Sequence, residues 1–270
     1  MKHLAIAFAL CFVLITKAQS QTTPLTIGQV RTFTSAVLKE ERTLNIYLPP
    51  NYDKEKPYPV IYLLDGSITE DFLHITGLVQ FFNLQLNMPE TIVVGIANVD
   101  RKRDFTFHTN LKDLQQDYPT TGHSDNFIKF IETELQPFIQ GNYKTTADKY
   151  VIGQSLGGLL AAEVLLKKPA LFSHYLIVSP SLWWDNESLL KQAKSLLAAQ
   201  PHLSRYVYIA VGRLEDKIMQ KDAKELYGLL SAANRKDLKL EYNLMPNDNH
   251  ATILNRSIYE AFLKLFPYKE

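Results

Sequence analysis

Short runs of apolar and β-branched residues recur along the chain from about residue 30 onward, and Gly, Pro, Asn and Asp cluster between them. Runs of this length, bounded by turn-forming residues, are typical of β-strands. Eight such runs predict strands at residues 30–37, 43–48, 59–64, 91–97, 150–153, 174–179, 206–211 and 238–245.

The segments between the later runs show the longer period of an amphipathic helix. Their apolar residues recur three or four positions apart, so each helix would lay one apolar stripe on a sheet. In the first of them Ser124 is a candidate N-cap, and Pro137 predicts a kink or an end near Leu135. The predicted helices cover residues 124–140, 156–168, 187–199, 217–233 and 252–266.

Strands that alternate with helices predict an α/β fold with a mostly parallel sheet covered by helices. The chain shows no internal repeat, no low-complexity linker and no shift in composition that would divide it. Only 26 residues separate Ser179 from Tyr206, which is room for a loop and one helix but not for a folded cap. We therefore expect one domain over residues 21–270, with an eight-stranded sheet and no large cap domain.

The first twenty residues have the pattern of a secretory signal peptide. Lys2 and His3 precede an uncharged apolar stretch at residues 4–15, and small residues suited to a signal peptidase follow around Ala18 and Ser20. Twelve apolar residues fall short of the roughly 20 that span a bilayer, which disfavours a membrane anchor. We expect residues 1–20 to be removed and the protein to be exported, periplasmic or secreted, with no stable membrane insertion after cleavage.

Cysteine and charge exclude several classes of function. Cys11 is the only cysteine and lies within the predicted signal peptide, so the mature chain has neither disulfides nor thiolate metal ligands. Loss of Lys2 and Lys17 leaves 27 basic residues against 28 acidic ones, and no long basic run remains. Nucleic acid is therefore not an expected partner.

The segment from Gly153 to Gly157 has the pattern G-x-S-x-G, with Ser155 at its centre. An apolar run enters it and a helix-like run leaves it, as in a nucleophile elbow, where glycines allow a sharp strand-to-helix turn. The bare pattern is short enough to occur by chance, so this context carries the prediction. Ser155 is the candidate nucleophile.

A serine nucleophile needs a histidine base and a carboxylate that orients the histidine. In α/β hydrolases the acid and then the histidine follow the serine along the chain, each in a loop after a late strand. His250 stands in the loop after the last predicted strand, and a solvated loop histidine is the alternative. Glu215 is the preferred acid, ahead of Asp216 and Asp248, and the choice among them stays open.

Acyl transfer also needs hydrogen-bond donors for the oxyanion. The backbone N–H of Leu156, which follows the nucleophile, is one candidate. The loop after the third strand supplies the other, so the N–H of Ser67 or of its neighbour is expected to donate. An ordinary strand-ending turn is the alternative for Asp65-Gly66-Ser67.

Three side chains are candidates for substrate binding. Trp183 and Trp184 would offer an aromatic wall, or would simply fix their loop to the core. Arg103, in the basic run that begins at Arg101, would attract an anionic ligand, or would belong to a solvated surface. The other histidines have no spacing suited to a metal site, and the expected chemistry needs neither a metal nor a cofactor.

Several segments together resemble the putative-esterase family of α/β hydrolases, which includes ferric-siderophore trilactone esterases, S-formylglutathione hydrolases and mycolyltransferases. The resemblance covers roughly residues 26–266. It implies that Ser155 is the nucleophile, His250 the base and Glu215 the acid. Gln154 and Asp65 depart from the family, which often has histidine before the nucleophile and, in many lipases, His-Gly after the third strand. The segments are residues 42–52, 58–66, 103–106, 153–158 and 179–184, the last of which (Ser-Pro-Ser-Leu-Trp-Trp) points to the siderophore-esterase branch.

The sequence thus predicts an exported serine carboxylic ester hydrolase that works through an acyl-enzyme and acts on a small-molecule or glycan ester. Ferric siderophore esters are one candidate substrate. Acetyl or feruloyl esters of glycans, and acyl transfer to an alcohol, are alternatives. A second alternative is a non-catalytic ligand-binding protein on a hydrolase scaffold. Nothing in the sequence indicates the oligomeric state.

Overall fold

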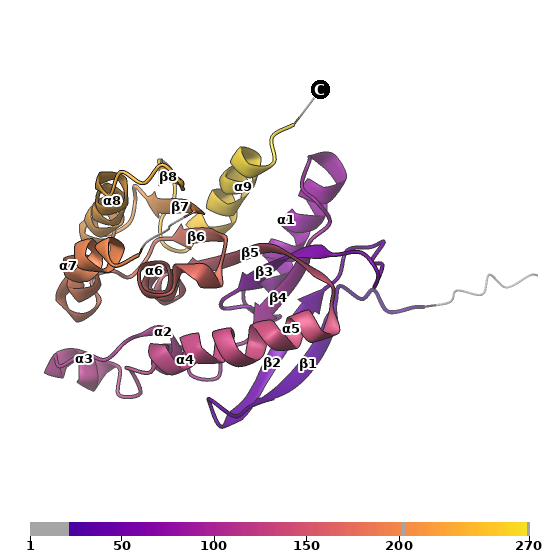
Figure 1. The fold of residues 1–270 in the computed structure, drawn as a ribbon, viewed down its shortest axis with the longest axis horizontal. Helices are drawn as coiled ribbons and strands as arrows, with labels where there is room; N and C mark the ends of the chain where they lie inside the picture. The colour runs from indigo at the N-terminus through magenta and orange to yellow at the C-terminus, as the bar shows by residue number, and fades with distance from the viewer. Residues whose placement is uncertain (1–21, 201–203, 269–270) are drawn as a thin grey trace, which may run out of the picture.

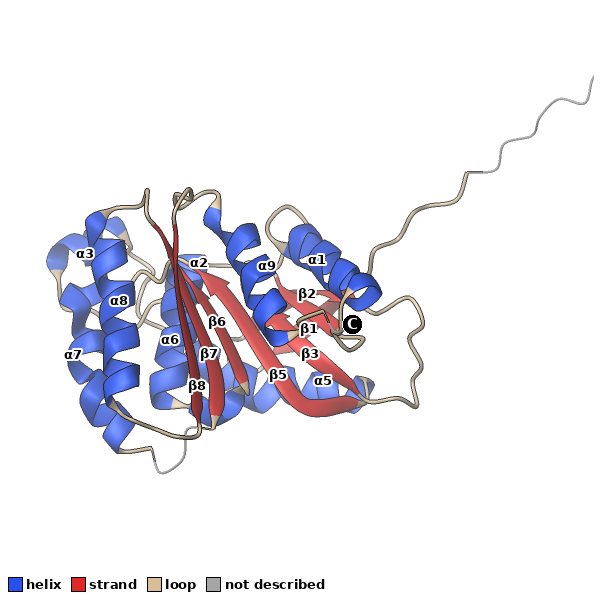
Figure 2. Cartoon of the chain, turned by 90° about the horizontal axis from the view of Figure 1, so that it is seen from above, coloured by secondary structure: helices blue, strands red, loops and turns tan. Residues whose placement is uncertain are grey.

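The computed structural model describes residues 22–200 and 204–268, so the predicted signal peptide lies outside the described residues. The strands form one eight-stranded sheet in the order β1-β2-β4-β3-β5-β6-β7-β8 (Figure 2). β2 is antiparallel to both of its neighbours, and the other pairs are parallel. The predicted α/β fold is confirmed. The strands are β1 Gln29–Ser35, β2 Glu40–Tyr47, β3 Tyr58–Leu63, β4 Ile92–Ile96, β5 Thr145–Gln154, β6 His174–Val178, β7 Arg205–Gly212 and β8 Leu238–Met245.

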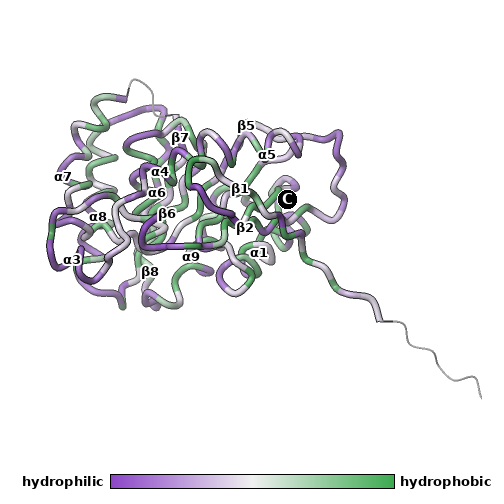
Figure 3. Tube along the Cα trace, turned by 90° about the horizontal axis from the view of Figure 1, so that it is seen from below, coloured by the Kyte–Doolittle hydropathy of each residue, from purple (hydrophilic) through white to green (hydrophobic). Residues whose placement is uncertain are grey.

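Helices cover both faces of the sheet (Figures 1 and 2). α1 and α9 pack together over one face, and α6 and α8 lie directly on the other, with α7 against them. Figure 3 shows hydrophobic segments along the central strands, while hydrophilic segments such as α3 lie at the periphery. The helices are α1 Phe72–Gln85, α2 Arg101–Phe105, α3 Lys112–Asp117, α4 Ser124–Phe130, α5 Gln136–Asn142, α6 Leu156–Lys167, α7 Trp184–Ala198, α8 Lys217–Ala232 and α9 Ile253–Leu265, with a 3₁₀ turn at Pro169–Leu171.

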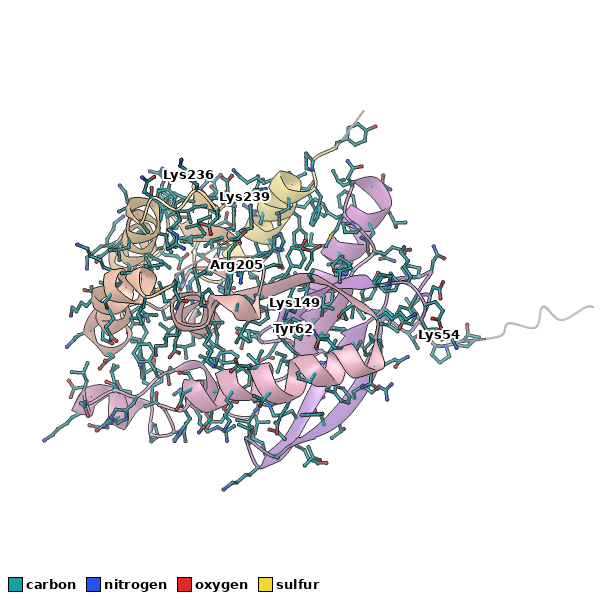
Figure 4. The ribbon with its side chains drawn as sticks, in the orientation of Figure 1. Lys54, Tyr62, Lys149, Arg205, Lys236 and Lys239 are labelled. Carbon is teal, nitrogen blue, oxygen red and sulfur yellow. The ribbon has the colours of Figure 1, made fainter. Side chains whose placement is uncertain are left out.

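Alternation along β3 divides the core into two layers. Ile61 and Leu63 face α1 and α9, whereas Val60 and Tyr62 face the opposite helices. Tyr62 is fully buried, and its ring lies 5.7 Å from that of Phe172 (Figure 4). Because both faces of the sheet are covered, the central strands are apolar at nearly every position, as expected of a parallel sheet.

The helix predicted over 124–140 does not end at Pro137. A π-helical turn, Ile131–Leu135, joins α4 to α5, so the three form one continuous helical segment (Figure 1). Proline lacks the N–H that an α-helical turn requires and its ring crowds the preceding turn, so a widened turn accommodates it. Within that turn Glu134 accepts hydrogen bonds of 3.0 Å from the backbone N–H groups of Ala36 and Val37.

Further segments differ from the predicted elements, among them the short helices α2 and α3, which the sequence does not predict. α1 lies outside the helix ranges predicted from the sequence, although it fills the connection between β3 and β4. α7 begins with a left-handed stretch at residues 185–187, where φ is 51°, 51° and 60°, so its regular part starts close to the predicted residue 187. Within residues 22–200 and 204–268, no helix combines the length and hydropathy needed to cross a membrane.

Candidate active site

Ser155 occupies the turn between β5 and α6, and its backbone has φ 59° and ψ −119°. Such a conformation is strained for a residue with a side chain and is typical of functional turns. Neighbouring backbone leaves no room for side chains beside it: a Cβ on Gly153 would lie 2.4 Å from the Gly157 carbonyl oxygen, and one on Gly158 would lie 2.8 Å from that of Val178. The glycines therefore permit the turn that holds the Ser155 hydroxyl at the edge of the sheet.

Glu215 and His250 meet beside this turn, although each follows a different strand. Glu215 Oε2 and His250 Nδ1 are 2.7 Å apart. The other oxygen, Oε1, accepts hydrogen bonds from the Ser179 hydroxyl at 2.5 Å and from the Gly212 N–H at 2.7 Å. With both oxygens engaged, the carboxylate is fixed in place and directs the imidazole through Nδ1, which leaves Nε2 for other chemistry.

The environment of Glu215 favours its charged form. Burial acts to raise the pKa of this carboxyl, but the hydrogen bonds from His250, Ser179 and Gly212 outweigh burial and hold the pKa below its ordinary value. Glu215 is therefore an anion at neutral pH. An anion at this position would stabilise an imidazolium at His250.

The two other candidate acids have different surroundings. Asp216 is exposed and precedes α8. Asp248 is buried, accepts a hydrogen bond of 2.9 Å from the Thr252 hydroxyl, and lies 3.6 Å from the Arg256 Nε. Of the three carboxylates, Glu215 is the one within hydrogen-bond distance of His250.

Ser155 and His250 line one cleft with a volume of about 380 Å³. Ser155 Oγ lies 3.3 Å from Ser181 Oγ, and among the described side chains no hydrogen bond joins it to His250. Catalytic hydrogen bonds are often long without substrate and tighten when substrate binds. The rest of the cleft is formed by the polar residues Asp65, Glu70, Asp71, Arg101 and Gln154. Of these, Arg101 belongs to the basic run for which the sequence predicts an anionic ligand, whereas the others are not among the predicted site residues.

The two candidate oxyanion donors differ in availability. Leu156 is the first residue of α6, so its N–H has no partner within the helix. The Ser67 N–H donates to Glu70 Oε2 at 3.2 Å. Ser67 would thus serve an oxyanion only after the Glu70 carboxylate moves aside.

The tryptophan pair does not line the cleft at Ser155. Trp184 is fully buried, donates from Nε1 to the Phe107 carbonyl oxygen at 2.9 Å, and packs edge-on against Tyr118. Trp183 is half-buried and packs against the same core. In this structure the two rings fix the loop before α7, which is the alternative interpretation of the sequence.

The basic run contributes to the site through Arg101 and not through Arg103. The Arg103 guanidinium binds Glu40 and Asp104, so it is directed away from the cleft. The Arg101 Nε and Nη2 atoms donate to the two carboxylate oxygens of Asp65 at 2.6 and 2.9 Å, and Nη2 also reaches the Gln154 carbonyl oxygen at 3.3 Å. The sequence indicates the basic run as a whole, but which of its side chains reaches the cleft depends on the orientation of α2.

A model of the family described as "Putative esterase" matches residues 35–253. The chain belongs to this family. Ferri-bacillibactin esterase BesA of Bacillus subtilis (strain 168) is 30% identical over 241 residues, which cover 80% of this esterase and 82% of the relative. The structure of an IroE-like serine hydrolase from Shewanella oneidensis matches with a TM-score of 0.82 at 29% identity, over 88% of this chain and 80% of that one. The BES protein from Bacillus cereus matches with a TM-score of 0.79 at 28% identity, over 92% and 97% of the two chains.

Membership of this family and the similarity to a serine hydrolase establish the broad activity of the esterase. Within the described residues, no group of three or more His, Cys, Asp or Glu side chains has a geometry that could hold a metal ion. The structure brings together a serine and a histidine in one cleft, with a buried carboxylate hydrogen-bonded to the histidine.

Proposed function

We propose that this esterase hydrolyses carboxylic esters through an acyl-enzyme on Ser155, with His250 as the base and Glu215 as the acid that orients it. One observation supports the assignment above the others. Glu215 Oε2 lies 2.7 Å from His250 Nδ1, and His250 shares a cleft with a serine that sits on a strained turn. A nucleophile, a base and an orienting acid are the three groups that acyl transfer by serine requires.

In the first half of the reaction, Ser155 Oγ attacks the ester carbonyl carbon and His250 Nε2 takes the hydroxyl proton. The Leu156 N–H receives the oxyanion, and the Ser67 N–H joins it by exchanging the Glu70 carboxylate for the oxyanion. His250 then gives its proton to the leaving alkoxide, which departs as the alcohol. In the second half, water attacks the acyl-enzyme with His250 as base, and the carboxylic acid leaves as Ser155 recovers its proton.

For the substrate we propose siderophore esters, with acetyl or feruloyl esters of glycans as the alternative. The relatives support the first class, because one is named a ferri-bacillibactin esterase and another, from Emericella nidulans, a siderophore enterobactin esterase. The segment between β6 and β7 also leaves the cleft without a folded cap, so a bulky ester has access.

A panel of iron-loaded siderophore esters, feruloylated and acetylated oligosaccharides, and simple aryl esters tests the substrate. Product formation is followed by liquid chromatography and mass spectrometry. We expect kcat/KM for a siderophore ester to exceed that for either glycan ester by about tenfold or more, the scale on which remote binding energy separates substrates. Higher kcat/KM for the glycan esters would contradict the siderophore proposal. An added alcohol that diverts the acyl group from water would favour acyl transfer.

We also propose that the esterase is exported, on the basis of the signal-peptide pattern in residues 1–20. Expressed from its full sequence in a bacterium with a general secretion pathway, the protein should be recovered outside the cytoplasm. Intact-mass measurement should show removal of roughly the first twenty residues. A full-length chain retained in the cytoplasm would contradict export.

A further inference from the structure

The proposed nucleophile and base are carried by segments that do not pair with one another in the sheet. Ser155 stands between β5 and α6, whereas His250 stands in the loop between β8 and α9. β6 and β7 lie between β5 and β8, so no strand pairing fixes the distance between the two side chains. Their alignment therefore depends on contacts between the turn at Ser155 and the loop at His250.

Gln154, the residue directly before the nucleophile, makes such a contact. Its side-chain Nε2 donates to the His250 carbonyl oxygen at 2.5 Å. Among the described residues, this is the hydrogen bond that joins the nucleophile turn, residues 153–158, to the loop of residues 246–252. His250 is thus held at two points, since Glu215 binds the ring at Nδ1 and Gln154 binds the backbone.

The backbone of Gln154 is itself fixed. It is the last residue of β5 and lies in register with Val178 of β6. Its carbonyl oxygen accepts a hydrogen bond from Arg101 Nη2 at 3.3 Å, and the N–H of the next residue, Ser155, donates to the Val178 carbonyl oxygen at 3.1 Å. A side chain on such a rigid strand end can hold its partner in a defined place.

The other bonds of the His250 loop do not reach the nucleophile turn. Asn249 Oδ1 accepts from the N–H groups of Ala251 and Thr252 at 2.9 and 3.2 Å, which shapes the loop locally. The Asp248 carbonyl oxygen accepts from the Leu214 N–H at 3.0 Å, which joins the loop to the segment of the acid. Without the Gln154 amide, the loop would keep its shape and its contact with the acid but lose its bond to the turn at Ser155.

We propose that Gln154 is a positioning residue that holds His250 at the distance from Ser155 that proton transfer requires. The inference rests on the proposed roles of Ser155 and His250 and deepens them, because Gln154 acts through the His250 backbone. Proton transfer needs donor and acceptor within hydrogen-bond reach, and a misplacement of about 1 Å can cost a factor of about 10² in rate.

Gln154→Leu tests the proposal with a side chain of similar volume that cannot donate a hydrogen bond. With a p-nitrophenyl ester at pH 8, we expect kcat to fall about tenfold to a hundredfold, while KM stays within about twofold of the wild type. The endpoint of fluorophosphonate labelling counts the competent sites, so that unfolded chain does not enter kcat. Gln154→Glu keeps the shape of the side chain but presents only acceptors to the carbonyl oxygen. It should show the same loss, and it replaces the leucine variant if that one does not fold.

Gln115→Leu is the matched control. Gln115 lies in α3, outside the residues that line the cleft, and its Nε2 also donates to a backbone carbonyl oxygen, that of Thr109 at 2.8 Å. The control therefore removes the same kind of bond by the same substitution. It should leave kcat within about twofold of the wild type.

A second measurement separates positioning from a general structural role. In the His250→Ala background the imidazole through which Gln154 acts is absent, so adding Gln154→Leu should lower the remaining rate less than about twofold. A general loss of structure, or a direct contact of Gln154 with the substrate, would lower that rate by the same factor as in the wild type.

A kcat that falls less than about threefold in Gln154→Leu, a loss confined to KM, or an equal loss in the His250→Ala background would overturn the positioning role while ester hydrolysis stands. If the wild-type protein cleaves no ester, the proposed function itself fails, and the positioning role fails with it. The wild-type rate therefore distinguishes the two failures.

Discussion

Replacing Ser155 with alanine is expected to lower kcat for ester hydrolysis by about 10⁴ to 10⁶, the scale seen when a serine nucleophile is removed. The Ser155 hydroxyl is the atom proposed to attack the ester carbonyl, and alanine has no group that can replace it. What activity remains would come from the oxyanion donors and substrate binding alone. The measurement is steady-state release of p-nitrophenol from a short-chain ester.

The fold should survive this change. Ser155 Oγ has one hydrogen-bond neighbour in the structure, Ser181 Oγ at 3.3 Å, whereas the turn is held by backbone bonds such as Ser155 N–H to the Val178 carbonyl at 3.1 Å. Thermal unfolding of Ser155→Ala should therefore match the wild type within a few degrees. Ser181→Ala is the matched control and should keep kcat within about tenfold, since it removes a hydroxyl but leaves the nucleophile. Undiminished turnover in Ser155→Ala would contradict the mechanism.

Replacing Glu215 with glutamine is expected to lower kcat by about 10² to 10⁴, as when the acid of a serine triad is neutralised. A neutral amide cannot stabilise the imidazolium of His250. The amide also has an N–H₂ group in place of one carboxylate oxygen, so one position that accepts hydrogen bonds in the native protein becomes a donor. In the native protein Oε1 accepts from Ser179 and Gly212, while Oε2 faces His250. The amide either loses one of these contacts or donates to His250 Nδ1, and the second arrangement fixes the imidazole in the tautomer protonated at Nε2, which cannot take the Ser155 proton.

Two matched controls separate the role of Glu215 from a general effect of acidic residues in these loops. Asp216→Asn changes an exposed neighbour and should alter kcat less than twofold. Asp248→Asn changes a buried carboxylate that supports the loop through Thr252, so its effect should appear mainly in stability. A large loss of kcat in Asp216→Asn, with kcat of Glu215→Gln nearly unchanged, would show that Asp216 and not Glu215 is the acid.

Much of the fold was predictable because local pattern and tertiary environment agree. The strands buried on both faces, such as β6, are continuous apolar runs, and the elbow between Gly153 and Gly158 has steric requirements that only glycine meets. The limits of α1 were harder to predict, because apolar residues lie on all sides of the helix. Leu73, Phe81 and Leu84 are exposed while Ile75 and Val79 are buried, so the helical period is blurred.

The candidate site residues could be inferred from the sequence, but their surroundings could not. Ser155, Glu215 and His250 follow strand ends in an order that can be inferred along the chain. The lining of the cleft depends on where side chains point, and this is decided by ion pairs between distant segments. Arg101 and Arg103 stand two residues apart, yet Asp65 draws one into the cleft and Glu40 holds the other away from it. The hydrophobic periodicity of the sequence carries no information about which way such side chains point.

Ser155 is proposed to form a covalent intermediate with the acyl group, and a fluorophosphonate, which reacts with an activated serine, tests this step. After incubation with the probe, intact-mass spectrometry should show one adduct per chain, and peptide mapping should place it on Ser155. Ser155→Ala should remain unlabelled, and Glu215→Gln should be labelled more slowly. A wild-type protein that stays unmodified, or an adduct that persists in Ser155→Ala, would contradict the account and favour a binding protein on a hydrolase scaffold.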